Sequence, residues 1–129
     1  MYMEIYFPGG KKVYADHDGT VIKTDQPATS GGEESAPTPF ELFIASMGTC
    51  AGFYVLDFLQ SRNLPADKAK LKLRAKRSQE THLMESILME IQLPPDFPEK
   101  YREAVVKAAA ACLVAKHFKR PPEIKVIAV

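Results

Sequence analysis

The two cysteines are the residues of this chain best suited to chemistry. Each lies in an apolar stretch with helical patterning and small neighbours, Cys50 within residues 48–52 and Cys112 within residues 109–113. Small residues let two helix axes approach more closely than the usual ~8–10 Å, and a disulfide needs Cα atoms within ~7 Å of each other. The pattern is compatible with a reversible dithiol/disulfide pair, a redox centre that needs no metal and no bound cofactor.

Either cysteine could instead be an inert core residue, because cysteine is among the most frequently buried residue types. A reactive thiol must lose its proton, and Cys50 lies roughly 18 Å along its expected helix, beyond the reach of the helix dipole. No cation stands three or four residues from Cys50, where Ser46, Met47, Phe53 and Tyr54 are found. A cation or another donor from elsewhere in the fold, or from a second subunit, must therefore lower the pKa of this thiol.

Length and composition favour one soluble domain over residues 1–129. The net charge of +1 gives no overall attraction to nucleic acid or anionic membranes. The longest apolar run, Leu42–Leu56, is interrupted by small polar residues and predicts no membrane span, and no signal segment is recognised. We expect a cytoplasmic protein whose thiols are normally reduced. The three histidines, His17, His82 and His117, lack a metal-ligand spacing with the cysteines, so no metal site is expected.

The first third of the chain predicts strands and a loop. Residues 1–7, 11–16 and 20–24 contain β-forming residues, and turn sequences separate them at residues 8–10 and 17–19. Residues 25–37 are rich in Pro, Gly, Ser and Glu and predict a loop.

A long helix is predicted from Thr38 to about Arg62. Thr38 is the expected N-cap, Pro39 the first helical residue, and Glu41 the partner in a capping box. Apolar residues surround this helix on nearly every side, which indicates burial on most faces. In so small a protein a partner subunit would be a natural cover, so we expect a homodimer.

The remaining elements are two strands, a helix and a final strand. Residues 70–76 and 86–93 alternate between polar and apolar residues and should pair antiparallel. A second helix should open at residues 96–99 and end before the prolines at 121–122, with Cys112 facing the core. Residues 123–129 predict a last strand. The order β-β-β-α-β-β-α-β indicates an α+β fold with antiparallel sheet and two central helices.

Two groups of polar residues have simple structural explanations. The basic residues of the 68–77 segment face acidic residues at Glu85 and Glu90 across the expected hairpin, which favours cross-strand ion pairs over nucleic-acid binding. Glu41 is nine residues from Cys50, about half a helical circumference away, so the two cannot touch within one straight helix. Completing the capping box is the simpler role of Glu41, and it does not exclude ordering a cation near Cys50.

Several segments together resemble the OsmC/Ohr family, in its compact OsmC-like branch. These are Thr24–Pro27, Gly31–Gly32, Pro37–Cys50 and the Ala-rich stretch that carries Cys112–Val114. The resemblance implies an intertwined homodimer with active sites at the subunit interface. It also implies reduction of organic hydroperoxides, with regeneration by a dithiol such as a lipoyl group. Cys50 would be the thiol that attacks the peroxide and is oxidised to sulfenic acid, and Cys112 the resolving thiol.

The resemblance also implies a cation beside the reactive thiol. In the family this is an Arg from the N-terminal strands, held by a Glu early in the helix, a role for which Glu41 is the candidate. This sequence has no Arg before Arg62. His17 occupies the turn where that Arg would stand, and Lys11, Lys12 and Lys23 are the other candidates. Neither an imidazole nor an ammonium reproduces the guanidinium geometry.

Three hypotheses follow from the sequence. The first is a thiol peroxidase with Cys50, Cys112, Glu41 and His17 in its site. The second is a catalytically inactive protein of the same fold that binds a small apolar ligand at the dimer interface. The third, which the charge balance disfavours, is a nucleic-acid-binding module that uses the basic strand.

Overall fold

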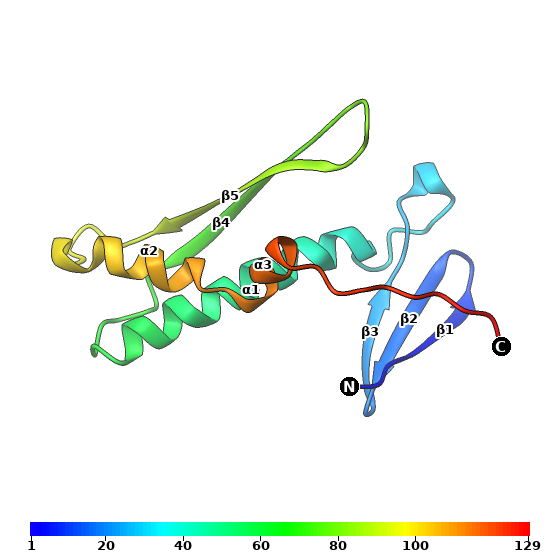
Figure 1. Cartoon of the computed structure of the whole chain (residues 1–129), viewed down its shortest axis with the longest axis horizontal. Coiled ribbons are helices and arrows are strands. Elements are labelled where there is room, and N and C mark those ends of the chain that lie inside the picture. The colour runs from blue at the N-terminus through cyan, green and yellow to red at the C-terminus, as the bar shows by residue number, and fades with distance from the viewer. The chain divides into compact units, whose positions relative to one another are not determined.

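The computed structural model describes residues 1–129 as an α+β protein with two antiparallel sheets and three α-helices (Figure 1). The chain forms two compact units, residues 1–45 and residues 46–129. The long helix α1, Pro39–Gln60, begins in the first unit and continues in the second.

The N-terminal unit contains a three-stranded sheet in the order β1-β2-β3. Its strands are β1 (Glu4–Gly9), β2 (Lys12–His17) and β3 (Thr20–Thr24). The β2–β3 hairpin closes through two residues with positive φ, Asp18 at 50° and Gly19 at 82°. Two such residues form the tight turn whose twist matches that of the flanking strands. The three strands and both turns expected from the sequence are confirmed.

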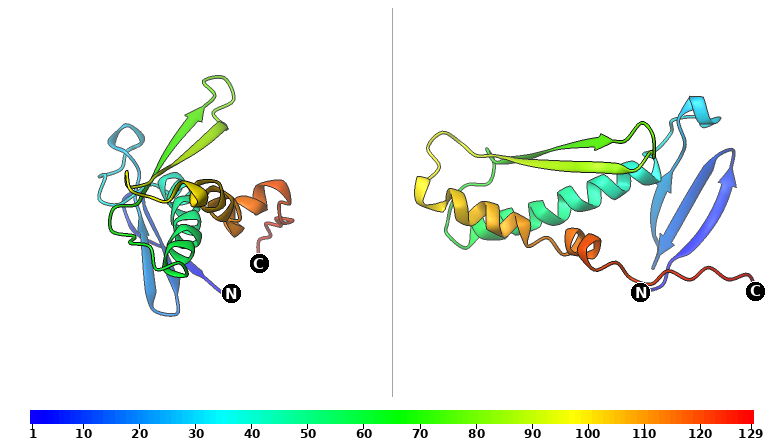
Figure 2. Two further views of the ribbon diagram at one scale, coloured as in Figure 1. Left: turned by 90° about the vertical axis from the view of Figure 1, so that its left-hand side faces the viewer. Right: turned by 45° about the horizontal axis from the view of Figure 1, so that its top comes forward.

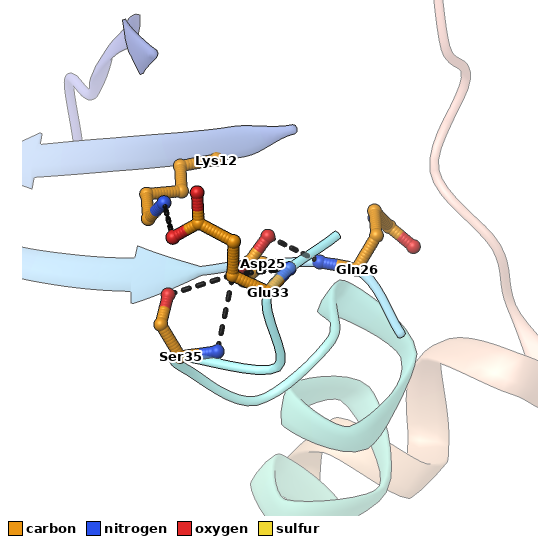
Figure 3. A network of polar contacts seen from close by, with 5 residues as sticks. All are labelled: Lys12, Asp25, Gln26, Glu33 and Ser35. Atoms are coloured by element: carbon orange, nitrogen blue, oxygen red, sulfur yellow. Dashed lines mark hydrogen bonds and ion pairs between the residues drawn. The ribbon is translucent and has the colours of Figure 1, made fainter. Parts of the chain in front are cut away.

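A buried aspartate organises the loop that follows β3. The Asp25 carboxylate is 0% exposed and accepts hydrogen bonds from the backbone N–H groups of Gln26, Glu33 and Ser35 and from the Ser35 hydroxyl (Figure 3). These bonds lower the pKa of Asp25 well below its usual range, with the Ser35 hydroxyl as the largest cause. The loop expected at 25–37 is confirmed, with a short 3₁₀ helix, η1 (Ala28–Ser30), inside it.

Helix α1 begins with the predicted capping box. The Thr38 Oγ1 atom accepts from the Glu41 backbone N–H at 3.2 Å, and the Glu41 carboxylate accepts from the Thr38 N–H at 2.7 Å. The reciprocal bonds satisfy two N–H groups that have no partner within the helix. Its length and hydropathy alone would also suit a membrane span. In the second unit, however, its apolar residues Ala51, Val55 and Leu59 are buried in a core, which accounts for this composition.

The C-terminal unit packs a hairpin against two helices. The strands β4 (Lys70–Arg77) and β5 (Met84–Gln92) pair antiparallel, as predicted, and run along α1 in both Figure 1 and Figure 2. Leu71, Met89 and Ile91 turn toward the core of α1 and α2. The opposite face of β4 carries the basic residues Lys70, Lys72, Arg74 and Lys76. Two of its residues form the expected ion pairs, Arg74 with Glu90 at 3.1 Å and Lys76 with Glu85 at 2.8 Å.

The prediction of one continuous second helix is wrong, because the helix is broken next to Cys112. A 3₁₀ turn, η2 (Glu99–Tyr101), leads into α2 (Arg102–Ala110), and α3 (Leu113–Lys119) is a separate helix. Cys112 lies between them with φ −44° and ψ 119° and serves as the N-cap of α3. Neither glycine nor proline stands at the break. The prediction that Cys112 faces the core is confirmed, since it is 1% exposed.

The predicted final strand at residues 123–129 does not form. The segment has no regular secondary structure, and its apolar residues Ile124, Val126 and Ile127 are 79–92% exposed. A strand requires a neighbour for its backbone hydrogen bonds, and this segment pairs with neither sheet of the chain. Its sequence alternates as a strand does, but no neighbouring strand in the chain pairs with it.

Candidate functional site

The two cysteines lie together in the C-terminal unit as free thiols. Cys50 is half-buried on α1, and Cys112 is buried at the break between α2 and α3. Each of the two thiols influences the pKa of the other, so their side chains are close neighbours. The structure therefore brings together two residues 62 positions apart in the sequence (112 − 50).

Small residues near the two cysteines are buried or closely packed. Ala51, next to Cys50, is 0% exposed, and Ala109 on α2 is buried in the same core cluster. Gly48 faces β4, where an added Cβ would stand 3.1 Å from a Leu73 methyl carbon. The expectation that small residues bring the two helix axes unusually close stays a prediction.

Cys112 is held in place by two further polar contacts. Its Sγ atom accepts a hydrogen bond from the Ala115 N–H at 3.4 Å, which makes it the cap of α3. Its thiol also lies 3.8 Å from the Met47 carbonyl oxygen, to which it can donate a weak hydrogen bond. Met47 is three residues before Cys50, so this contact positions Cys112 on the turn of α1 that precedes Cys50.

The first turn of α3 provides the donors that acidify Cys50. The pKa of Cys50 is lowered from its ordinary value, and the largest cause is a hydrogen bond from the Val114 backbone N–H. Partial burial opposes this effect, while the Cys112 thiol and the Leu113 N–H add to it. The N–H groups of a first helical turn have no partner within the helix, so they are available to a thiolate.

The pKa of the other thiol, Cys112, is shifted in the opposite direction. Burial is the largest cause that raises the pKa of Cys112, and the neighbouring Cys50 adds to it. The Ala115 N–H lowers it only in part. The two neighbouring thiols thus differ in acidity: the pKa of Cys50 is lowered and that of Cys112 is raised, so Cys50 is the more readily deprotonated of the two.

This arrangement supplies the activating donor that the sequence left unidentified. The donors are backbone N–H groups of Leu113 and Val114, and they are exposed because the helix breaks at Cys112. Sequence reasoning missed them, since a continuous helix through residues 96–120 would have used those N–H groups internally. No glycine, proline or polar cap in the 109–115 stretch signals the break.

The other predicted site residues belong to the N-terminal unit. Glu41 completes the capping box, and its hydrogen bonds with Thr38 lower the pKa of its carboxyl group. His17 lies at the end of β2, where its Nδ1 atom is 2.8 Å from the Tyr2 carbonyl oxygen. Among the lysine candidates, Lys12 pairs with Glu33. The catalytic roles assigned to Glu41 and His17 from the sequence stay predictions.

A family model for OsmC-like protein matches residues 31–127. The chain belongs to the OsmC family. The match includes both cysteines and the whole of α1. Comparison with curated proteins gave no match.

Solved structures of similar fold cover nearly the whole chain. A protein of Psychrobacter arcticus 273-4, named for osmotic stress induction and a detoxification response, has a TM-score of 0.76 at 17% identity, over 88% of this chain and 85% of its own. An OsmC-like protein of Mycoplasma pneumoniae gives 0.66 at 12% identity, over 84% and 79%. The organic hydroperoxide resistance protein OhrB of Bacillus subtilis gives 0.54 at 18% identity, over 97% and 96%. At these identities the likeness concerns the fold.

Proposed function

We propose that this OsmC-family protein is a thiol peroxidase that reduces organic hydroperoxides through Cys50 and Cys112. The observation that carries the proposal is the proximity of two thiols of opposite pKa shift, Cys50 on α1 with a lowered pKa and Cys112 at the N-cap of α3 with a raised one. Membership in a family with an organic hydroperoxide resistance protein among its structural neighbours supports the same chemistry.

The chemistry begins at the Cys50 thiolate. It attacks the terminal oxygen of the hydroperoxide, an S–O bond forms, the O–O bond breaks, and the alkoxide leaves as an alcohol after taking a proton. Cys50 is then a sulfenic acid. The Cys112 thiol loses its proton and attacks the Cys50 sulfur, so that an S–S bond forms and the hydroxyl leaves as water. The peroxide has gained two electrons, and the two thiols have become a disulfide.

The acidity difference assigns these two roles. A thiolate is the nucleophile in each step, so the thiol with the lowered pKa reacts first with the peroxide. The raised pKa of Cys112 keeps it from competing, and its sulfur is already adjacent when Cys50 becomes sulfenic acid. The backbone donors of α3 make a charged side chain unnecessary for acidifying Cys50, which suits a chain without an Arg before residue 62.

The rest of the proposal concerns partners and location. The apolar side chains around the thiols favour an organic hydroperoxide over hydrogen peroxide. A small dithiol, or a lipoyl group on another protein, would reduce the disulfide. We further propose a cytoplasmic homodimer. The exposed apolar side chains Phe53 and Leu56 of α1, at 63% and 40%, are surface that a second copy could cover.

Turnover of cumene hydroperoxide with dihydrolipoamide as reductant tests the proposal. We expect wild-type protein to consume peroxide catalytically and Cys50→Ser to lose turnover. Cys112→Ser should react once and retain a sulfenic acid at Cys50, detected by mass after trapping with dimedone. Serine at 112 preserves an acceptor for the Ala115 N–H, so α3 keeps its cap. Full turnover by Cys50→Ser would contradict the assignment of the nucleophile.

A further inference from the structure

A cavity in the C-terminal unit lies between β5 and α2 (both labelled in Figure 1) and reaches Cys112. Its volume is about 300 Å³. Met89 and Ile91 of β5 line one wall, Val106 and Ala110 of α2 line the other, and Cys112 contributes as well. This volume is at the lower end of the ~300–1,000 Å³ typical of small-molecule sites.

The cavity has one charged residue, Arg102, in the first turn of α2. Its side chain is 45% exposed, and its Nε atom donates to the Glu99 carboxylate at 2.7 Å. A guanidinium has five N–H donors in a fixed plane, so the terminal NH₂ groups are left to bind another acceptor. Every other residue that lines the cavity is apolar. One end of the cavity is thus cationic, and the remainder is hydrocarbon.

We propose that this cavity binds an unbranched alkyl carboxylate, with its chain among the apolar side chains and its head group on Arg102. The small volume and the alanines of the α2 wall suit a single chain better than a ring system. A single guanidinium, already shared with Glu99, suits a head group with one negative charge, because a dianion would be repelled by the Glu99 carboxylate. The proposal concerns the reduced protein and does not rest on the peroxidase cycle.

Calorimetric titration with octanoate and with octanol separates the chain from the head group. We expect saturable binding of both ligands to reduced wild-type protein, with octanoate the tighter. Arg102→Gln should weaken octanoate about fivefold, the scale of a partly exposed ion pair, and leave octanol unchanged. Raising the salt concentration should weaken octanoate alone. Lys107→Gln is the matched control, because Lys107 is a cation of the same helix that pairs with Glu103 and does not line the cavity.

Two further variants locate the ligand. Ala110→Leu adds bulk at a surface position of the cavity wall and should abolish binding of both ligands. Glu99→Gln frees the Arg102 Nε and should tighten octanoate only. Methyl signals of Met89 and Ile91 should shift on titration in the wild type. Absence of saturable octanoate binding, or equal losses of octanoate and octanol in Arg102→Gln, would overturn the proposal, as would unchanged binding in Ala110→Leu.

Discussion

Two acidic side chains of this protein, Asp25 in the N-terminal unit and Cys50 in the C-terminal unit, both have their pKa lowered by backbone N–H groups. Each is stabilised by backbone N–H groups rather than by a positively charged side chain. The Asp25 carboxylate is fully buried and accepts from three backbone N–H groups and a hydroxyl, all within ten residues of it. Cys50 is half-buried and receives its donors from a helix more than sixty residues later.

The two sites differ in the groups that surround the acidic atom. Around Asp25 every donor belongs to the loop that the carboxylate organises, so the charge holds residues 26–35 in one conformation (Figure 3). At Cys50 the nearest side-chain partner is another thiol, which is itself able to form a bond with the sulfur. The same hydrogen-bonding principle thus stabilises a structural carboxylate in one unit and favours the deprotonated form of the proposed nucleophile in the other.

The largest effect expected from this comparison is unequal reactivity of the two thiols. With iodoacetamide at neutral pH we expect Cys50 to be alkylated on the order of a hundredfold faster than Cys112, because its pKa is lowered while that of Cys112 is raised by burial. The thiolate fraction of Cys50 grows as pH rises through its pKa, so its alkylation should already be rapid below the pH at which a free cysteine reacts. Mass spectrometry of peptides over a pH series gives both rates.

The control for this measurement is the same series in denaturant, where the two rates should converge. Slow alkylation of both native thiols, with midpoints at or above that of free cysteine, would make them inert core residues. Backbone donors would then lower the pKa of Asp25 alone, and Cys50 would have no acidified thiol.

A proline at position 113 removes one donor while preserving the fold. Leu113 is the first residue of α3, a position that favours proline, and Cys112 before it has the extended backbone that a following proline requires. We expect Leu113→Pro to raise the pKa of Cys50 and to slow its reaction with hydroperoxide on the order of tenfold. Stopped-flow oxidation with cumene hydroperoxide and the alkylation profile measure the two effects.

Leu113→Ala is the matched control, because it removes an exposed side chain and keeps the N–H. It should react like the wild type. Equal rates for the proline and alanine variants would show that the Leu113 N–H does not activate Cys50. The Val114 N–H, or a cation from elsewhere, would then be the remaining candidate.

Neutralising Asp25 should cost stability and spare reactivity. In the wild type the Ser35 N–H and hydroxyl donate to a carboxylate oxygen of Asp25. Asp25→Asn replaces one carboxylate oxygen by an NH₂ group, which cannot accept these bonds, so we expect the melting temperature to fall by several degrees. The pKa of Asp25 is lowered on folding, so its contribution is fully present above the unfolded value of ~3.9 and is lost only as pH falls through the folded value. The deficit of the variant should therefore be constant from neutral pH to about pH 5 and shrink in stronger acid.

Cys50→Ser provides the contrast for this measurement, since it should lose peroxide turnover with little change in melting temperature. A stable Asp25→Asn protein, as resistant to heat as the wild type, would mean that the loop is held by its other contacts. One of these is the close approach of Gly32 to the Gln26 carbonyl, where an added Cβ would lie 1.8 Å from the oxygen.

Local chemistry explains which parts of the fold the sequence predicted. The Asp18-Gly19 turn, the Thr38–Glu41 capping box and the alternation of residues 70–76 act over a few residues, and each appears where it was expected. In each case the residue types themselves impose the geometry.

The features that the sequence did not predict depend on distant partners. The break at Cys112 has no local signal, yet it aims the N–H groups of α3 at a sulfur 63 and 64 positions earlier in the chain. The expected strand at residues 123–129 has the correct alternation but no neighbour within the chain. Helix breaks and strand pairing of this kind are set by packing, which periodicity does not report.

The smallest expected effect concerns Glu41, a second carboxylate held by local donors. Its hydrogen bonds with the Thr38 N–H and hydroxyl lower its pKa, and the side chain is exposed. Glutamine keeps an acceptor of the same length and still completes a capping box. We therefore expect Glu41→Gln to retain both the melting temperature and, within about twofold, the rate of Cys50 oxidation, because the amide oxygen can accept the same hydrogen bonds from Thr38.

Glu41→Ala is the control that removes the cap as well as the charge, and it should lower the melting temperature where Glu41→Gln does not. The informative contrary outcome is a Glu41→Gln protein that melts like the wild type but reduces peroxide slowly. Such a result would separate charge from capping and place Glu41 in the reaction, because the only property lost is the negative charge that orders a cation. Glu41 would then resemble neither Asp25, whose charge is structural, nor Cys50, whose charge is itself the nucleophile.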